Sequence, residues 1–93
     1  MSVVIVGGNE CMQRNYLDVC RQFRCKAKIF PKMERNMQNF GTPDLLILFT
    51  GTCSHKLVRC ALSKIDENRT RVARSHSASL SALRAIMGEH FGG

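Results

Sequence analysis

The chain has 93 residues, of which 44% are hydrophobic, and this length suffices for one small domain. No apolar run approaches the roughly 20 residues that span a bilayer, and no charged leader precedes the first apolar run, so we expect no membrane segment, no signal peptide and a cytoplasmic location. Fourteen Lys and Arg against seven Asp and Glu give a net charge of +7, which favours an anionic partner.

The cysteine content indicates reduced thiols. There are five cysteines, an odd number, and no CxxC pair, which argues against a zinc ribbon and against a thioredoxin-like redox pair. We expect Cys11, Cys20 and Cys60 to pack as small buried hydrophobes. With one Tyr and no Trp, the chain offers few platforms on which single-stranded nucleic acid can stack.

The first half of the chain predicts two strands around one helix. Residues 2–6 are a β-branched run, typical of a strand buried on both faces, and two glycines end it. Asn9 is a natural helix cap. The helix after it has apolar side chains at helical spacing, namely Met12, Tyr16, Val19, Cys20 and Phe23. Residues 26–30 predict a second strand, and residues 32–40 predict one or two helical turns.

The second half predicts two further pairs of strand and helix. Residues 44–49 are the most apolar stretch and predict the third strand. Ser54 is a natural cap for a helix whose inner face consists of Leu57, Val58, Ala61, Leu62 and Ile65. Residues 71–74 predict a short fourth strand. The last helix is lined by Leu80, Leu83, Ile86 and Met87, and we expect residues 91–93 to be frayed.

Alternation of strands and helices predicts one α/β domain over residues 1–90. It is a small doubly wound parallel sheet of about four strands, in the order 2-1-3-4, with helices on both faces. Ligands of such sheets bind beyond the carboxyl ends of the strands, where the strand order reverses. The candidate ligand-binding residues at that edge are Gly7, Gly8, Asn9, Thr50, Ser54, His55 and His76.

Several short segments, taken in order and spacing, resemble a known family over nearly the whole chain. They are Val6-Gly7-Gly8, Arg14 and Tyr16, Pro43-Asp44-Leu45, Ser54-His55, Arg74-Ser75 and Ser79-Leu80-Ser81-Ala82-Leu83. This pattern resembles the DUF2325 family of small bacterial and archaeal proteins. The resemblance implies a small α/β domain and a homodimer, and it adds haem to the ligands to consider. It supports the paired glycines and Ser54-His55 as site candidates, whereas Cys53 is not part of the pattern.

The first hypothesis for the site is haem or metal ligation. His55 and His76 are expected on neighbouring loops, and Cys53 lies two residues before His55. A Cys and two His would be three ligands of a metal site with an open position. A single axial His or Cys beside an apolar wall suits haem, whose propionates the surplus of Lys and Arg would hold.

A second hypothesis is a phosphatase-like enzyme. Cys53 and Arg59 have the C-x5-R spacing of a loop in which a thiolate attacks phosphorus and an Arg holds the oxygens. The loop has no glycine, and no Asp is evident as a general acid, so this hypothesis is the weaker one. The protein is more consistent with a binding module than with an enzyme, and we assign no catalytic residue.

The remaining hypotheses are anion and nucleic-acid binding. Gly7 and Gly8 before a helix would allow an anion to approach the backbone, although neither GxGxxG nor GxxxxGK[ST] occurs. A basic region around the fourth strand would consist of Arg59, Lys64, Arg69, Arg71 and Arg74. The sequence thus predicts a cytoplasmic protein that binds haem or a transition metal in sensing, regulation or storage. The alternative is a module that binds a nucleotide, a small anion or, less favoured, nucleic acid.

Overall fold

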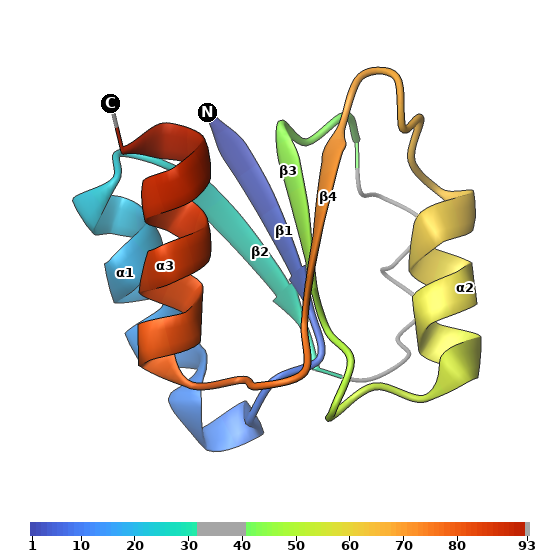
Figure 1. Ribbon diagram of the computed structural model, residues 1–93, viewed down its shortest axis with the longest axis horizontal. Coiled ribbons are helices and arrows are strands. Elements are labelled where there is room, and N and C mark those ends of the chain that lie inside the picture. The colour runs from blue at the N-terminus through green and yellow to red at the C-terminus, as the bar shows by residue number, and fades with distance from the viewer. Residues whose placement is uncertain (32–40, 93) are drawn as a thin grey trace.

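The computed structural model describes residues 1–31 and 41–92, which form a parallel sheet with helices on both faces (Figure 1). The predicted helical turns at 32–40 lie outside the described residues. In chain order the elements are β1 (Ser2–Val6), η1 (a 3-10 helix, Glu10–Met12), α1 (Gln13–Gln22), β2 (Lys26–Phe30), β3 (Leu45–Phe49), α2 (His55–Ser63), β4 (Arg71–Ser75) and α3 (Leu80–Phe91).

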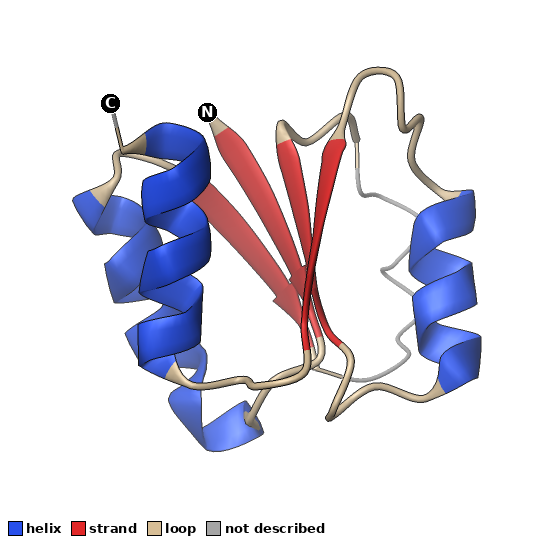
Figure 2. Ribbon diagram, viewed as in Figure 1, coloured by secondary structure: helices blue, strands red, loops and turns tan. Residues whose placement is uncertain are grey.

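The sheet has the predicted topology. Its four strands run parallel in the order β2-β1-β3-β4, which confirms a doubly wound α/β fold. All strands end at the lower edge in Figure 1, where η1, α2 and α3 begin, and both chain termini lie at the opposite edge. Figure 2 shows that loops alone connect the strand ends to these helices at the lower edge. The loops that follow β1, β3 and β4 therefore lie together at this carboxyl edge of the sheet.

The two central strands are buried on both faces, as predicted for β1. Successive side chains of a strand point to opposite faces, so each strand supplies both cores. One core lies against α1 and α3 and includes Val3, Ile5, Tyr16, Val19, Cys20, Leu45, Ile47, Phe49, Leu83 and Met87. The other lies against α2 and includes Val4, Val6, Leu46, Leu48, Leu57 and Ala61. The predicted inner faces of the three helices are therefore confirmed.

Ser54 caps α2 as predicted, whereas Asn9 caps only the short η1, and α1 begins at Gln13 without a side-chain cap. The Asn9 carboxamide accepts a hydrogen bond from the Cys11 N–H at 2.9 Å and caps η1. The Ser54 hydroxyl accepts one from the Leu57 N–H at 3.1 Å and caps α2. In the described ranges no helix has the length and apolar content needed to cross a bilayer.

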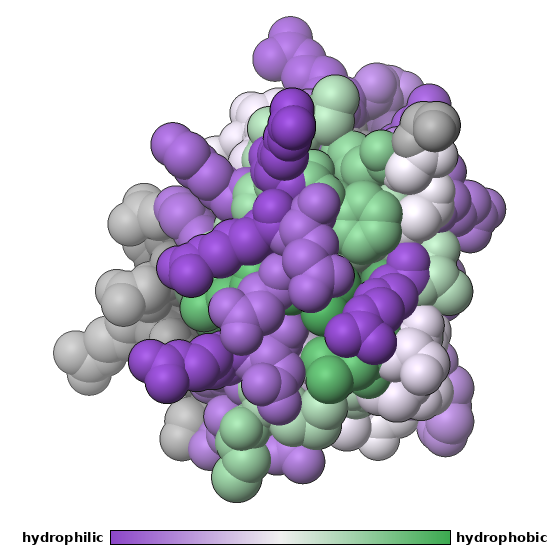
Figure 3. Space-filling model, turned by 90° about the vertical axis from the view of Figure 1, so that its left-hand side faces the viewer, coloured by the Kyte–Doolittle hydropathy of each residue, from purple (hydrophilic) through white to green (hydrophobic). Residues whose placement is uncertain are grey.

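The outer surface is mostly polar. Figure 3 looks onto the side covered by α1 and α3, where long hydrophilic side chains lie over an apolar surface that shows between them. Met1, with 74% of its surface exposed, is the exposed large hydrophobic residue of the described part. It lies at the amino edge of the sheet, away from the carboxyl-edge loops.

The cysteines are all free thiols, but they are not all buried. Cys20 and Cys25 are buried, and Cys60 is partly buried against the α2 core. The prediction for Cys11 was wrong, because η1 lies on the outside of the carboxyl edge and buries none of its residues. The apolar face of the helix begins with Met12 and continues through Tyr16, which leaves Cys11 on the solvent side.

Burial raises the pKa of the Cys20 thiol to about 11, with a smaller contribution from Cys25. Because the folded state keeps this proton at a pH where the unfolded chain loses it, stability is full below pH 9 and falls as the pH rises towards 11. We expect the free energy of unfolding to drop by about 1 kcal/mol between pH 8 and pH 10 from this thiol. Urea unfolding at both pH values measures the drop, and Cys20→Ala should show less of it. An equal drop in both proteins would contradict the assignment.

Candidate functional site

Three loops form the candidate site at the carboxyl edge of the sheet. They are residues 7–9 after β1, residues 50–54 after β3 and residues 76–79 after β4, and we call them together the carboxyl-edge site. Most of its polar side chains are exposed to solvent, including those of Asn9, Thr50, Thr52, Ser54, His76, Ser77 and Ser79. These exposed groups give the edge a surface of hydroxyl, amide and imidazole groups.

The first loop contains two glycines for reasons of space and backbone conformation. Gly7 has φ +89° and Gly8 has φ +91°, which side chains of L-residues rarely allow. A Cβ on Gly7 would lie 2.3 Å from the Cys53 Sγ. A Cβ on Gly8 would lie 2.9 Å from the Tyr16 ring. The glycines thus let the loop after β1 pack against the loop after β3 and against α1.

The backbone N–H groups of this first loop are already bonded within the fold. The Gly7 N–H donates to the Phe30 carbonyl at 2.9 Å, and the Gly8 N–H donates to the Thr52 hydroxyl at 2.7 Å. The Asn9 N–H donates to the Tyr16 hydroxyl at 3.1 Å. A phosphate could take these donors only by displacing internal bonds. The glycines therefore serve loop packing here, and the other two loops hold the groups that are available to a ligand.

The second loop is tied to β1 and β3 by Thr52 and Cys53. The Thr52 hydroxyl accepts the bond from Gly8 and donates to the Phe49 carbonyl at 3.0 Å. The half-buried Cys53 thiol donates to the Val6 carbonyl at 3.3 Å. Desolvation raises the pKa of this thiol, opposed in part by its backbone environment near Phe49. Cys53 therefore stays protonated at neutral pH and faces the backbone.

The third loop rests directly on the second. A Cβ on Gly51 would lie 2.3 Å from the His76 carbonyl oxygen and 3.1 Å from the His76 ring, so glycine permits this close approach. The Thr50 N–H donates to the Ser75 carbonyl at 2.8 Å and continues the β3–β4 ladder past Phe49. His76, in the loop after β4, therefore packs against Gly51 in the turn that leads into α2.

Tyr16 joins the first loop to the third through its buried hydroxyl. This oxygen accepts the Asn9 N–H and donates to the Ala78 carbonyl at 2.7 Å, while the ring packs on Phe49 at 5.5 Å between centroids. The sequence predicts Tyr16 on the inner face of its helix but does not predict the role of its hydroxyl. The available signal was a tyrosine at a fully buried position, where a buried O–H needs a partner.

Comparison with known protein families gives a match over most of the chain. A family model described as an uncharacterized protein conserved in bacteria, DUF2325, matches residues 2–90. The chain belongs to the DUF2325 family. No curated protein and no solved structure matches it.

This DUF2325 chain does not assemble the predicted three-ligand metal set. The described residues contain no group of three His, Cys, Asp or Glu side chains placed to hold a metal ion, so Cys53, His55 and His76 are not brought together as ligands. The physical reason is that Cys53 faces the Val6 carbonyl, His76 lies on Gly51, and His55 is exposed at the start of α2. The described loops also lack an exposed large apolar side chain to form the wall of a haem pocket.

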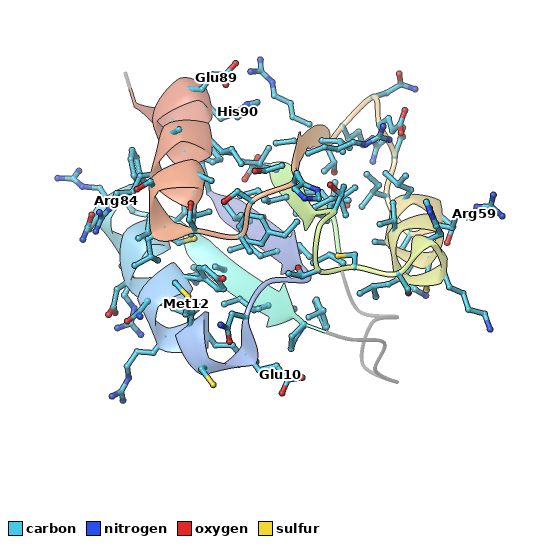
Figure 4. The ribbon with its side chains drawn as sticks, turned by 60° about the horizontal axis from the view of Figure 1, so that its bottom comes forward. Glu10, Met12, Arg59, Arg84, Glu89 and His90 are labelled. Atoms are coloured by element: carbon cyan, nitrogen blue, oxygen red, sulfur yellow. The ribbon has the colours of Figure 1, made fainter. Side chains whose placement is uncertain are left out.

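The phosphatase-like hypothesis is not supported by the DUF2325 structure. A nucleophilic cysteine needs a lowered thiol pKa, whereas burial raises that of Cys53. Arg59 projects from the outer side of α2 into solvent and does not turn back to the loop (Figure 4). The C-x5-R spacing therefore does not form a phosphate-binding loop.

The first turn of α2 adjoins the carboxyl-edge site of the DUF2325 domain and carries a lysine but no acidic residue. His55 and Lys56 occupy this turn, both are exposed, and the first turns of α2 and α3 contain no acidic residue. A helix N-terminus has unpaired N–H groups and a positive dipole end, and it usually carries acidic side chains. A cation at this position is repelled by the positive end of the helix dipole. A bound anion would interact favourably with both the cation and the dipole.

Proposed function

We propose that this domain binds a small anionic ligand at the carboxyl-edge site, a phosphate-bearing ligand above all, without catalysing a reaction on it. The observation that carries the proposal is the first turn of α2, where Lys56 and His55 replace the usual acidic residues at a capped helix N-terminus. The net charge of +7 supports the same class of ligand.

The donors for such a ligand come from the first turn of α2 and from the second and third loops. Ser54 satisfies the Leu57 N–H, and the N–H groups of His55 and Lys56 remain for a ligand, because the first N–H groups of a helix have no partner within it. The exposed side chains of Thr50 and His76 lie on the adjoining turns. Backbone N–H groups, an ammonium and a hydroxyl together match the oxygens of a phosphate.

We expect Lys56→Gln to weaken binding of inorganic phosphate or a nucleoside monophosphate by about tenfold, since one charge-assisted contact is worth roughly 1.5 kcal/mol. Titration calorimetry at low salt measures the change. Lys64→Gln is the matched control, because Lys64 ends the same helix and its loss removes the same charge. Equal weakening in both variants would indicate general electrostatics, and no binding by the parent protein would end the proposal.

Replacement of Lys56 by Glu should have opposite effects on phosphate binding and on stability. Lys56→Glu should raise the stability of the ligand-free protein by about 0.5 kcal/mol, because a carboxylate suits a helix N-terminus, while it abolishes phosphate binding. Urea unfolding without ligand measures the first effect. A loss of stability in this variant would show that Lys56 supports the fold itself.

Haem or transition-metal binding, predicted from the sequence, remains a proposal with its own test. Titration with ferric haem should give a saturable, shifted Soret band that His55→Ala removes. The anion is preferred because the described loops offer polar donors rather than an apolar wall. A homodimer and a regulatory role in the cytoplasm are part of the proposal, and the five free thiols support a reducing compartment.

A further inference from the structure

The outer edge of β4 carries backbone groups without a strand partner. The Arg71 N–H donates to the Asp44 carbonyl and the Ser75 carbonyl accepts from the Thr50 N–H, so odd-numbered residues of β4 pair with β3. In a parallel ladder the alternate residues face the other way. The N–H and C=O groups of Val72 and Arg74 therefore point away from β3, and the described part of the chain has no strand beyond β4.

A hollow of about 610 Å³ follows this edge. It is lined by Glu67, Thr70, Arg71, Val72, Arg74 and His90. Figure 4 shows His90 on the side of α3 that faces the sheet. The hollow thus lies between the end of α3 and the exposed edge of β4, with room beside the strand for another chain.

The charge at this edge is positive and uncompensated. Arg71 and Arg74 are exposed, and neither forms an ion pair within residues 1–31 and 41–92. Because side chains alternate along a strand, Arg71 belongs to the face covered by α3, and Arg74 belongs with Val72 to the face covered by α2. The two guanidinium groups therefore flank the edge from opposite faces, three residues apart, and Glu67 is the carboxylate in the lining.

We propose that the edge of β4 binds an extended acidic segment of a partner protein, which adds to the sheet as a fifth strand. The backbone of Val72 and Arg74 would supply the hydrogen bonds, and the two arginines would select a segment with carboxylates on both of its faces. Acidic residues three apart in an extended segment satisfy this requirement, because side chains at an odd spacing lie on opposite faces.

An acidic peptide segment fits the edge of β4 better than a second copy of the chain or a nucleic acid does. A second copy would bring another Arg71 and Arg74 to a strand that already has two uncompensated cations, and like charges across a strand pair are destabilising. A nucleic acid would use the arginines but not the peptide-spaced backbone groups. Charged residues on an edge strand can also serve to prevent its pairing with other strands. If Arg71 and Arg74 have only this protective role, no peptide should bind, so the peptide experiment separates the two roles.

The probe is a fluorescein-labelled, end-capped peptide, Thr-Glu-Val-Val-Glu-Thr, measured by fluorescence anisotropy and by amide NMR of the full chain. We expect saturable binding, with shifts in the Val72 and Arg74 amide signals. A peptide of the same composition with the two Glu moved two apart, Thr-Glu-Val-Glu-Val-Thr, should bind at least about fivefold more weakly, because one arginine loses its partner. The first peptide with alternate amides N-methylated should not bind.

Arg74→Glu should weaken binding of the first peptide by about tenfold or more, since it replaces an attraction with a repulsion. Arg84→Glu is the matched control, because Arg84 is exposed on α3 and points away from β4 (Figure 4), and it should change binding by less than about twofold. Val72→Pro removes one outward N–H without touching the β3–β4 ladder, and it should weaken binding while the fold persists.

Three results of the peptide-binding experiments would overturn the proposal, and one result of sedimentation would do so as well. The three are equal binding of the two isomeric peptides, no binding of the first peptide at millimolar concentration, and displacement of that peptide by a single-stranded oligonucleotide that binds more tightly. Sedimentation that shows a dimer blocking the edge, with unshifted Val72 and Arg74 signals on peptide addition, would assign the edge to a second copy instead. None of these results bears on phosphate binding at Lys56, so the two proposals fail independently.

Discussion

Gly7→Ala should destabilise the protein by roughly 3 kcal/mol or more, the largest effect that we expect from one added methyl group. Two penalties combine at this position. The backbone has φ +89°, and the new Cβ would lie 2.3 Å from the Cys53 Sγ and 3.0 Å from the Phe49 carbonyl oxygen. A domain of this size has a total stability of about 5 to 14 kcal/mol, so the loss is a large part of it. Urea unfolding followed by circular dichroism measures it.

Gly41→Ala is the matched control for the backbone penalty. Gly41 also has a positive φ, +68°, but no atom of the described residues lies within 4 Å of a Cβ built there, so we expect a loss of only about 1 kcal/mol. Adding Cys53→Ala to Gly7→Ala should recover part of the larger loss by removing the sulfur atom. Equal losses for the two glycines would contradict the close packing of the loops after β1 and β3.

Tyr16→Phe should cost about 2 kcal/mol, although it removes a single oxygen atom. That oxygen accepts the Asn9 N–H and donates to the Ala78 carbonyl, and the side chain is fully buried. Phenylalanine would keep the packing on Phe49 but leave both backbone groups without this partner. Urea unfolding measures the loss. Hydrogen exchange should show the Asn9 amide exchanging faster than in the parent protein.

Ser75→Ala provides the comparison for Tyr16→Phe. The Ser75 hydroxyl, at the end of β4, donates to the Ser77 carbonyl at 2.8 Å in a bond that is exposed to solvent. Because water can replace this bond, we expect a change within about 0.5 kcal/mol. If both variants lose the same stability, the buried hydroxyl has no special role in joining the loops.

The fold could be predicted from the sequence because its signals are local. Two apolar runs indicated the two central strands, the first of them as buried on both faces, and Ser54 marked the start of α2. Asn9 marked the start of η1, three residues before α1 begins. The strand order followed from the rule for connections between parallel strands. These features depend on spacing within one element, which a single sequence displays directly.

The site was harder to predict because it depends on distances between loops. Cys53 and His55 are two residues apart, yet one faces a backbone carbonyl and the other solvent, since a strand-to-helix turn separates them. The proximity of Gly51 and His76, 25 residues apart in the chain, leaves no trace in local spacing. Residue types indicated which loops matter, whereas the bonds between loops decided which groups remain available to a ligand.

The sheet has a separate hydrophobic core on each of its faces, and this separation affects how the chain can fold during synthesis. Ile5, Ile47 and Phe49 are covered by Leu83 and Met87 of α3, the last helix, and Tyr16 bonds to a carbonyl at residue 78. A growing chain can complete the α2 side of the sheet first, but its other side stays partly uncovered until α3 has emerged. Such an intermediate exposes apolar surface and is prone to aggregation. The chain is therefore expected to tolerate truncation poorly at α3, even though that helix contributes little to the candidate site.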